Sequence, residues 1–281
     1  MRTGLLGAAC LLFAACSEDE RATAGAGVPE GAAALADLAP QPDLAPDLAI
    51  VDRDQDGLDD ARELAWAAAY LPYLSISPMD GCDTLGILVR VRPHPKNPTR
   101  LHVIYDQLYD RDCGLGGHVG DDEVFAATID PARPPPGGIV ALKAISHQGT
   151  PCQRVSECGR CMGQTACATL ARGEVAWPAV WPSRGKHGSY VNRASTCGAI
   201  MTCLDSCDDN PTPRLPPLVN AGEPDHPLVH DLTTDGFITA GNGWKNMELF
   251  HFDPWGGKKF GGAGIVSADL VDSAFDTPVC D

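Results

Sequence analysis

Hydrophobic residues alternate with polar or small residues along several stretches of the chain. One such stretch carries an apolar side chain at every second position, at Leu85, Ile87, Val89 and Val91. Successive side chains of a β-strand point to opposite faces of its sheet, so this period of two predicts strands. The stretches predicted as strands are 85–91, 100–109, 123–129, 138–146 and 173–181.

Clusters of Pro and Gly separate these stretches, and little helical periodicity lies between them. This arrangement predicts a mainly β fold, an antiparallel β-sandwich. One helix is expected over 58–71, because the segment is rich in Ala and Leu, has Asp59 and Asp60 in its first turn, and is followed by Pro72. From about residue 205 onward the chain is expected to form long ordered loops.

The N-terminus has the pattern of an export signal. An apolar stretch too short to cross a bilayer follows one Arg and ends at Phe13-Ala14-Ala15-Cys16, which resembles the cleavage site of bacterial lipoproteins. Cys16 would then carry a lipid anchor, and by the same resemblance Ser17 favours the outer membrane. The alternative is ordinary cleavage and secretion, with Cys16 incidental.

The patterns divide the chain into four parts. Residues 1–16 form the signal peptide, and residues 17–50 form a disordered spacer of Ala, Pro and Asp. Residues 51–72 form a calcium loop and helix, and residues 73–281 form the β domain.

The overall charge limits the partners. The 281 residues have a formal net charge of −16. Binding to nucleic acid needs clustered Lys and Arg, so the charge argues against a nucleic-acid partner. A membrane partner is expected through the lipid anchor.

Ten cysteines remain once Cys10 and Cys16 are set aside, an even number in a chain expected to be exported. Disulfides are the expected state in an oxidising compartment, and their connectivity cannot be deduced from the sequence. The candidates are Cys82, Cys113, Cys152, Cys158, Cys161, Cys167, Cys197, Cys203, Cys207 and Cys280. A zinc site remains an alternative for four of them, Cys152, Cys158, Cys161 and Cys167.

An acidic loop at 52–63 matches every fixed position of the EF-hand calcium loop, with Gly57 at the sharp turn. Calcium takes six to eight oxygen ligands, so convergent carboxylates suit it. The expected ligands are Asp52, Asp54, Asp56, the Leu58 carbonyl and Glu63. No helix precedes the loop, and we therefore expect a structural Ca²⁺ site rather than a sensor.

A second group of polar residues lies in "GGHVGDDE" at 116–123. In the expected strand, Asp121 and Glu123 share a face with the core-like Phe125. Buried carboxylates need a cation or another positive partner, and His118 lies on the Gly-rich turn just before them. These residue types suit a divalent metal. The alternative is a set of separate, solvent-facing side chains.

Together with "ISHQG" at 145–149 and "SRGKHGSY" at 183–190, this motif resembles the necrosis-and-ethylene-inducing-like proteins and a vacuolar-sorting-associated family with an HxGDWE motif. The resemblance implies a β-sandwich that damages membranes through a divalent-metal site. By this resemblance the ligands would be Asp110, His118, Asp121 and Glu123, with His147 and His187 behind them. The chain departs at Gly120, where the first family has a second His, and at Asp122, where both have Trp.

These observations favour an exported lipoprotein of the outer membrane, or an extracellular protein, that acts as a binding or membrane-interacting module. The expected cofactors are Ca²⁺ and a second divalent cation, Ca²⁺ or Mg²⁺. A lipid headgroup or glycan is the expected ligand. The alternative is a metal-dependent hydrolase that uses His118, Asp121 and Glu123, with His147 or His187 as general base.

Overall fold

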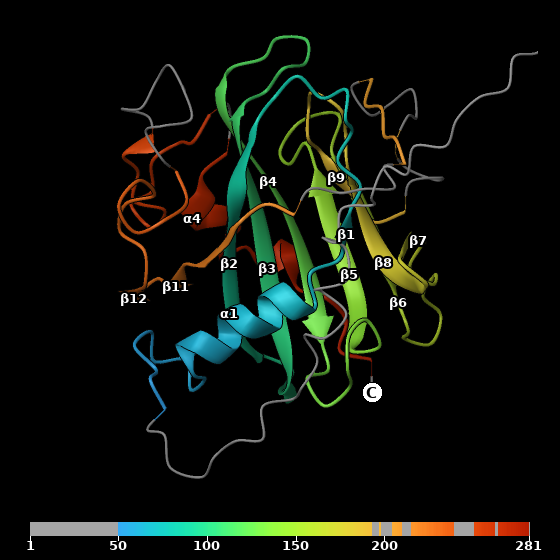
Figure 1. The fold of residues 1–281 in the computed structure, drawn as a ribbon, viewed down its shortest axis with the longest axis vertical. Helices are drawn as coiled ribbons and strands as arrows, with labels where there is room; N and C mark the ends of the chain where they lie inside the picture. Colours follow the sequence, from blue (N-terminus) through green and yellow to red (C-terminus); the bar gives the residue numbers. More distant parts are fainter. Residues whose placement is uncertain are drawn as a thin grey trace, which may run out of the picture. The chain divides into compact units, whose positions relative to one another are not determined.

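The computed structural model describes residues 50–192, 197, 204–209, 215–238, 250–261 and 264–280. Its main element is a six-stranded sheet with the order β10-β2-β3-β4-β5-β6 (Figure 1). The strands are β2 (Thr84–His94), β3 (Asn97–Arg111), β4 (Val119–Ile129), β5 (Ile139–Ser146), β6 (Arg154–Gly159) and β10 (Leu218–Asn220). Strands β2 to β6 are antiparallel to their neighbours, whereas β10 runs parallel to β2.

A smaller sheet packs beside it. Its strands are β1 (Tyr73–Leu74), β7 (Thr169–Arg172), β8 (Val175–Pro182) and β9 (Ser189–Tyr190), and β8 pairs with the other three. The strand predicted over 173–181 starts two residues later, because residues 173 and 174 form the turn between β7 and β8. Gly173 has a φ of +63° there, a conformation that glycine adopts easily.

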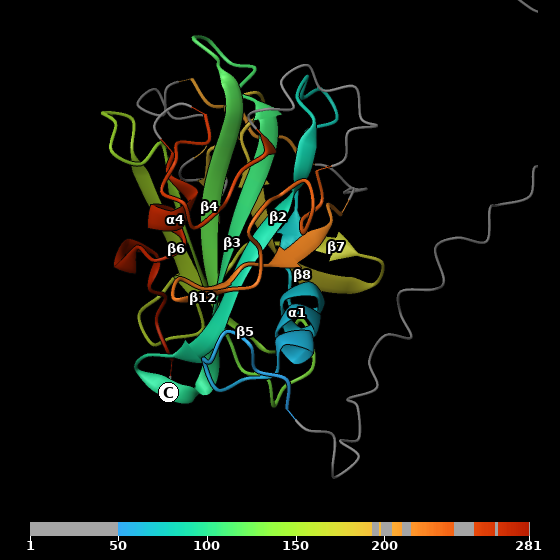
Figure 2. The ribbon, with the colours of Figure 1, turned by 90° about the vertical axis from the view of Figure 1, so that its left-hand side faces the viewer.

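Both faces of the larger sheet are buried. The register places Tyr105 opposite Val89 and Phe125, so the odd-numbered residues of β2 from Ile87 onward share one face with those of β3 and β4. A register shift between Thr84 and Gly86 places Leu85 in the cluster on the opposite face, contrary to the predicted period of two. This face packs against the N-terminal helix and against Leu74 and Val180 of the smaller sheet. Figure 2 shows the helix α1 and the smaller sheet on one side of β2–β4 and helix α4 on the other.

The C-terminal part of the chain covers the opposite face. Even-numbered residues such as Leu88 and Ile104 pack there against Phe250, Phe260 and Leu270. The elements of this part are β11 (Gly222–Glu223), β12 (His226–Pro227), α4 (Val266–Asp269) and a 3-10 turn, η2 (Ser273–Phe275). The region predicted as long loops is mostly irregular, and it supplies half of a second hydrophobic core.

Helix α1 covers Asp60–Ala69, inside the predicted range of 58–71. Asp59 caps it, because its Oδ1 accepts a hydrogen bond of 3.0 Å from the Arg62 backbone N–H. The mainly β fold with two sheets, disulfides and one short N-terminal helix is thereby confirmed.

Disulfides link both near and distant segments of the chain. The pairs are Cys82–Cys113, Cys158–Cys167, Cys161–Cys280 and Cys197–Cys207. Cys152 is also disulfide-bonded. The alternative of a zinc site at Cys152, Cys158, Cys161 and Cys167 is wrong, because disulfide sulfurs do not offer thiolates. Cys203 lies outside the described residues.

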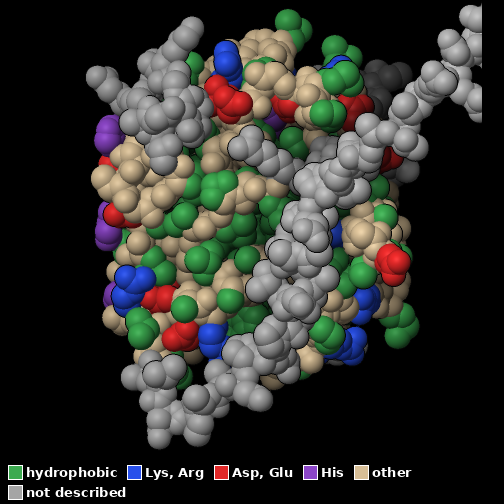
Figure 3. All heavy atoms as spheres, viewed as in Figure 1, with side chains coloured by type: hydrophobic (Ala, Val, Ile, Leu, Met, Phe, Trp, Pro, Cys, Tyr) green, Lys and Arg blue, Asp and Glu red, His purple; other side chains and the backbone are tan. Residues whose placement is uncertain are grey.

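The signal peptide (1–16), Cys16 and the spacer (17–50, apart from Ile50) also lie outside the described residues. Residues 46–281 form one compact unit. Within the described ranges, no helix is long and apolar enough to span a membrane. On the face drawn in Figure 3, acidic and basic side chains lie mainly around the rim, and hydrophobic side chains gather nearer the centre.

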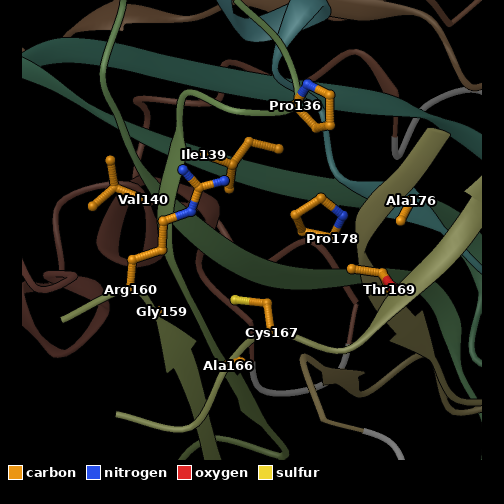
Figure 4. A pocket seen from close by; sticks show the side chains of 10 residues that line it. All are labelled: Pro136, Ile139, Val140, Gly159, Arg160, Ala166, Cys167, Thr169, Ala176 and Pro178. Atoms are coloured by element: carbon orange, nitrogen blue, oxygen red, sulfur yellow. The ribbon is translucent and has the colours of Figure 1, made fainter. Parts of the chain in front are cut away.

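A small cavity lies between β5 and β6 on one side and β7 and β8 on the other. Its lining is largely apolar, with Ile139, Val140 and Pro178 facing it (Figure 4). Arg160 is the one charged residue in the lining, and its Nη1 donates to the Gly137 carbonyl at 2.7 Å. The lining includes no Asp, Glu or His, so this cavity offers no carboxylate or imidazole to a metal ion.

Candidate metal sites

The acidic loop before α1 folds its carboxylates inward. Gln55 and Gly57 have φ values of +63° and +94°, which turn the chain sharply. The Gly57 N–H donates to Asp52 Oδ2 at 3.1 Å, and the Leu58 N–H donates to Asp56 Oδ1 at 2.7 Å. Backbone N–H groups of the loop therefore bind one oxygen of each carboxylate, Asp52 Oδ2 and Asp56 Oδ1, which we call the outer oxygens.

The inner oxygens of this loop have no hydrogen-bond partner although they are buried. They are Asp52 Oδ1, both Oδ atoms of Asp54, Asp56 Oδ2 and Glu63 Oε1. Asp54 and Glu63 are 1% and 0% exposed. Ligand atoms of Asp54, Asp56 and Glu63 lie within 4.8 Å of one another. Unpartnered buried carboxylates are costly, and several that converge on one point fit a hard cation such as Ca²⁺.

The pKa values of the loop acids follow from this crowding. Burial, together with the charges of Asp56 and Asp60, raises the pKa of Asp54 to about 7. Burial and the charges of Asp56 and Asp54 raise the pKa of Glu63 to about 9. Without a cation the loop therefore retains protons near neutral pH, and a bound cation would displace them.

One residue of this loop was missed by the sequence reasoning. Asp60 occupies position nine of the EF-hand pattern and forms a second group with Asp52 and Asp54, again within 4.8 Å. Its carboxylate accepts from the Arg53 backbone N–H at 2.9 Å and from Arg53 Nε at 2.6 Å. The residue at position nine of an EF-hand loop often contacts Ca²⁺ through a water molecule. The spacing of the motif therefore already pointed to Asp60. Leu58 packs its side chain on the core beside α1, and its carbonyl stays a predicted ligand.

The second candidate group lies where β3 and β4 pair. The register sets Tyr109 opposite Asp121 and Gln107 opposite Glu123. His187, predicted to stand behind the ligands, lies with Nδ1 2.7 Å from Asp121 Oδ2 and stacks on Tyr109 with ring centroids 3.7 Å apart. Its Nε2 lies 3.4 Å from Asp80 Oδ1. His187 is thus held between two carboxylates.

This placement fixes the charge of the imidazole. Burial opposes protonation of His187, but hydrogen bonds with Asp121 and Asp80 outweigh it and raise its pKa to about 9. Burial raises the pKa of Asp121, and the bond to His187 acts against that shift. His187 is therefore protonated at neutral pH and balances the negative charge of the pair.

His118 stands at the rim of this group. Its Nδ1–H donates to the Gly120 carbonyl at 2.7 Å, and its Nε2 lies 3.9 Å from Asp112 Oδ2. Asp112 also accepts from Lys186 Nζ at 2.9 Å. Asp110, the upstream acid predicted from the resemblance, accepts from the Asp83 backbone N–H and pairs with Arg111. The acid beside His118 is thus Asp112.

His147 belongs to an adjoining cluster. Its Nε2 lies 2.8 Å from Asp205 Oδ2, which also accepts from the Tyr190 hydroxyl. The other oxygen of Asp205, Oδ1, is buried without a partner. Burial raises the pKa of Glu123 well above its usual range, and the charges of Asp121, Asp122 and Asp205 add to the shift. Glu123 therefore lies within electrostatic reach of both Asp121 and Asp205.

The described residues contain three groups whose metal-ligand atoms lie within 4.8 Å of one another. Two belong to the acidic loop. The third joins Asp80 to Cys82 and Cys113, which are disulfide-bonded to each other and offer no thiolate. The predicted set of Asp110, His118, Asp121 and Glu123 does not form such a group, so the second metal site stays a prediction.

Asp80, Asp112 and Asp205 were missed at this second group. Asp112 stands two residues from the acid that the sequence favoured. Asp80 and Asp205 come from loops 41 residues before and 84 residues after Asp121 in the numbering. Only the pairing of strands brings those loops together, and no local spacing signals it.

No family model matches the chain, and no curated protein matches it. Solved structures give distant likenesses. One, "NLPPya in complex with glucosamine", is 15% identical with a TM-score of 0.34, covering 67% of this chain and 89% of that one. "NLPPya in complex with mannosamine" is 14% identical with a TM-score of 0.36, covering 73% and 99%. "Toxin fold for microbial attack and plant defense" is 15% identical with a TM-score of 0.34, again covering 73% and 99%. The chain is thus distantly similar in structure to this toxin fold.

Proposed function

We propose that this protein is an exported, calcium-binding β protein that acts as a binding or membrane-interacting module. The observation that carries the proposal is the set of buried, unpartnered carboxylate oxygens in the loop from Asp52 to Glu63. Ca²⁺ would be held by Asp52, Asp54, Asp56 and Glu63 and would brace the start of α1 against the sheet. The disulfides support export, because such bonds persist in oxidising compartments.

The proposal includes a second divalent cation, Ca²⁺ or Mg²⁺, at the end of β3 and β4. Asp121 is 9% exposed and has an acid two residues away on the same face, at Glu123. Protonated His187 balances one of these charges, and the charges that raise the pKa of Glu123 are those of other acids, Asp121 and Asp122 foremost. His118 and Asp112 at the rim would complete an oxygen-rich set with one imidazole. Asp110, near the end of β3, would take part only if its contacts with the Asp83 N–H and Arg111 changed.

Exposed apolar residues lie close in sequence to acids of this second group and support contact with a membrane. Met79, Leu115 and Leu204 are 65%, 89% and 82% exposed. Met79 precedes Asp80, Leu204 precedes Asp205, and Leu115 lies in the turn between Asp112 and His118. The Cys82–Cys113 disulfide fastens two of these loops together. Apolar tips around a cation site suit insertion beside a polar headgroup.

The ligand would be a lipid headgroup or its glycan, held through the cation and the apolar tips. A lipid at Cys16 would keep the module at the outer membrane, and cleavage without lipidation would release it. The proposed contact with lipid is reversible, since the apolar side chains stand singly on three loops.

A metal-dependent hydrolase is the second candidate. The contact between His147 and Asp205 favours it, because a carboxylate that orients an imidazole is a common arrangement for a general base. His187 suits this role poorly, since its pKa of about 9 keeps it protonated. His147 is therefore the base that this alternative would use.

The test compares three proteins: the wild type, the double variant Asp121→Asn with Glu123→Gln, and the control Asp83→Asn. Asp83 is an exposed acid at the same end of the sheet. After dialysis against Ca²⁺ or Mg²⁺, we expect the double variant to hold about one cation equivalent fewer than the wild type. We also expect it to lose binding to vesicles that carry glycolipid or anionic headgroups. Metal content by mass spectrometry and vesicle co-sedimentation measure these effects.

Equal metal content in the double variant and the wild type would contradict the second site. Turnover of phosphodiester or ester substrates that ends on chelation and in a His147→Ala variant would favour the hydrolase instead. Vesicle binding by the double variant at the wild-type level would show that the cation plays no part in membrane contact.

A further inference from the structure

The calcium loop is joined to a strand far along the chain. Asn220, in β10, donates from Nδ2 to Glu63 Oε2 at 2.5 Å. Asn220 is 7% exposed and Glu63 is fully buried, so water does not compete for this bond. The Asn220 Oδ1 in turn accepts from the Gly222 N–H at 3.2 Å, which fixes the orientation of the amide. The loop is thereby joined to β10 through the last of its proposed ligands.

Strand β10 is short and lies at the edge of the sheet. It has three residues and lies parallel to β2, pairing at Ile87 to Val89. Short parallel edge strands are weak on their own. The Ala221 N–H extends the pairing to the Val89 carbonyl at 2.8 Å. Helix α1 packs against both β2 and β10 (Figure 1).

The segment after β10 reaches the other face of the sheet. Glu223 forms a bidentate ion pair with Arg90, and Arg90 Nη1 donates to the Leu270 carbonyl at the end of α4. Trp255 Nε1 donates to the Ala221 carbonyl at 2.9 Å. A continuous set of contacts therefore runs from Glu63 through Asn220 to the C-terminal layer.

We propose that Asn220 is a positioning residue of the calcium site, and that calcium bound in the loop holds residues 218–223 on the sheet. This inference rests on the proposed calcium site and adds its coupling to β10. A closing Glu must present both oxygens to the ion. Oε2 is held by Asn220 and Oε1 is free, so the amide fixes the carboxylate in one orientation.

The coupling follows from the two oxygens of Glu63. A cation bound at Oε1 would hold the carboxylate in the orientation in which Oε2 accepts from Asn220. Without the cation, the bond from Asn220 alone holds that orientation, so we expect the contact between the loop and β10 to loosen. Linkage is reciprocal. A substitution of Asn220 that removes its contact with Glu63 should therefore weaken calcium binding and also reduce the extent to which bound calcium holds β10 on the sheet.

The experiment uses the purified full chain with and without Ca²⁺. Titration calorimetry gives the calcium affinity of the wild type, of Asn220→Ala, and of a control, Asn97→Ala, at the β2–β3 turn. We expect Asn220→Ala to bind Ca²⁺ roughly tenfold more weakly, as is typical when a partner of a metal ligand is removed. The control should bind as the wild type does.

Hydrogen exchange supplies the second readout. In the wild type, the amides of residues 218–223 should exchange more slowly with Ca²⁺ than with chelator, and this protection should fall in Asn220→Ala. The wild-type comparison needs no variant, so it decides the matter even if Asn220→Ala does not fold. Unchanged affinity in Asn220→Ala, or equal exchange of residues 218–223 with and without bound Ca²⁺, would overturn the coupling alone. A wild type that binds no Ca²⁺ would overturn the calcium site as well.

Discussion

Replacing Glu63 with Gln should remove most of the stabilisation that calcium gives to the fold. A ligand at about 100 times its Kd stabilises the folded state by about 2.7 kcal/mol. For a domain of this size that corresponds to a rise in Tm of roughly 5–10 °C. The Glu63→Gln variant keeps the shape of the side chain but loses the charge that closes the site. Thermal unfolding in Ca²⁺ and in chelator measures the effect.

In chelator the same substitution should not destabilise the fold. Burial beside Asp54 and Asp56 raises the pKa of Glu63 to about 9, so the side chain is protonated near neutral pH, and Gln has the shape of the protonated acid. The variant should then unfold at the wild-type temperature or above it. The matched control is Glu174→Gln, at an exposed acid in the β7–β8 turn, which should change neither temperature. The same calcium-dependent rise in Tm for Glu63→Gln and the wild type would rule out this assignment of the loop.

The two candidate sites differ in how far the sequence could predict them, and the reason is their range along the chain. The acidic loop is one continuous segment, so its proposed calcium ligands follow from local spacing, and position nine of the same pattern points to Asp60. The second group is assembled from the ends of β3 and β4 and from three other loops. The sequence indicated Asp121 and Glu123 through the strand period, and it favoured Asp110 where the structure places Asp112 beside His118.

The sequence likewise predicted the strands of the fold but not the irregular layer that covers them. The period of two predicted β2 and the buried face of Ile87, Val89 and Val91, and the same reasoning applied to β3, β4 and β5. It placed Leu85 on that face as well, whereas a register shift puts Leu85 in the opposite cluster. It did not indicate that Leu88 is also fully buried. That burial depends on residues 250–275, whose aromatic side chains carry no strand or helix period. A covering layer of irregular chain has no local signature, although its Phe residues were visible in the sequence.

The acids of β4 lie on both faces of the larger sheet. One face carries the second candidate metal group, and the other carries buried acids without a proposed ligand. Asp121 and Glu123 point toward the histidines, whereas Asp122 lies on the opposite face, where Gly264 packs against its carboxylate. Asp106 lies on the face of Asp122, on the neighbouring strand. Asp106 is 0% exposed, and both of its carboxylate oxygens lack a partner. Two described basic residues on that face, Arg90 and Lys143, form ion pairs with Glu223 and Glu157.

Asp106 should therefore make the fold less stable as the pH rises. Burial raises the pKa of Asp106 well above its usual range, and the charges of Asp269 and Asp121 add to the shift. Below the ordinary Asp pKa, both the folded and the unfolded chain carry the proton. Between the unfolded and folded pKa values only the folded chain carries it, so stability falls by about 1.4 kcal/mol per pH unit.

The Asp106→Asn variant removes this loss, because a neutral amide has the shape of the protonated acid. We expect it to match the wild type near pH 4 and to be more stable at pH 8, as measured by urea unfolding across that range in chelator. The control is Asp225→Asn, at an exposed acid, which should leave the pH dependence unchanged. If Asp106→Asn is instead less stable than the wild type at pH 8, then Asp106 is ionised and paired with a positive charge. A cation would then lie on this face of the sheet too, since Arg90 and Lys143 are already paired.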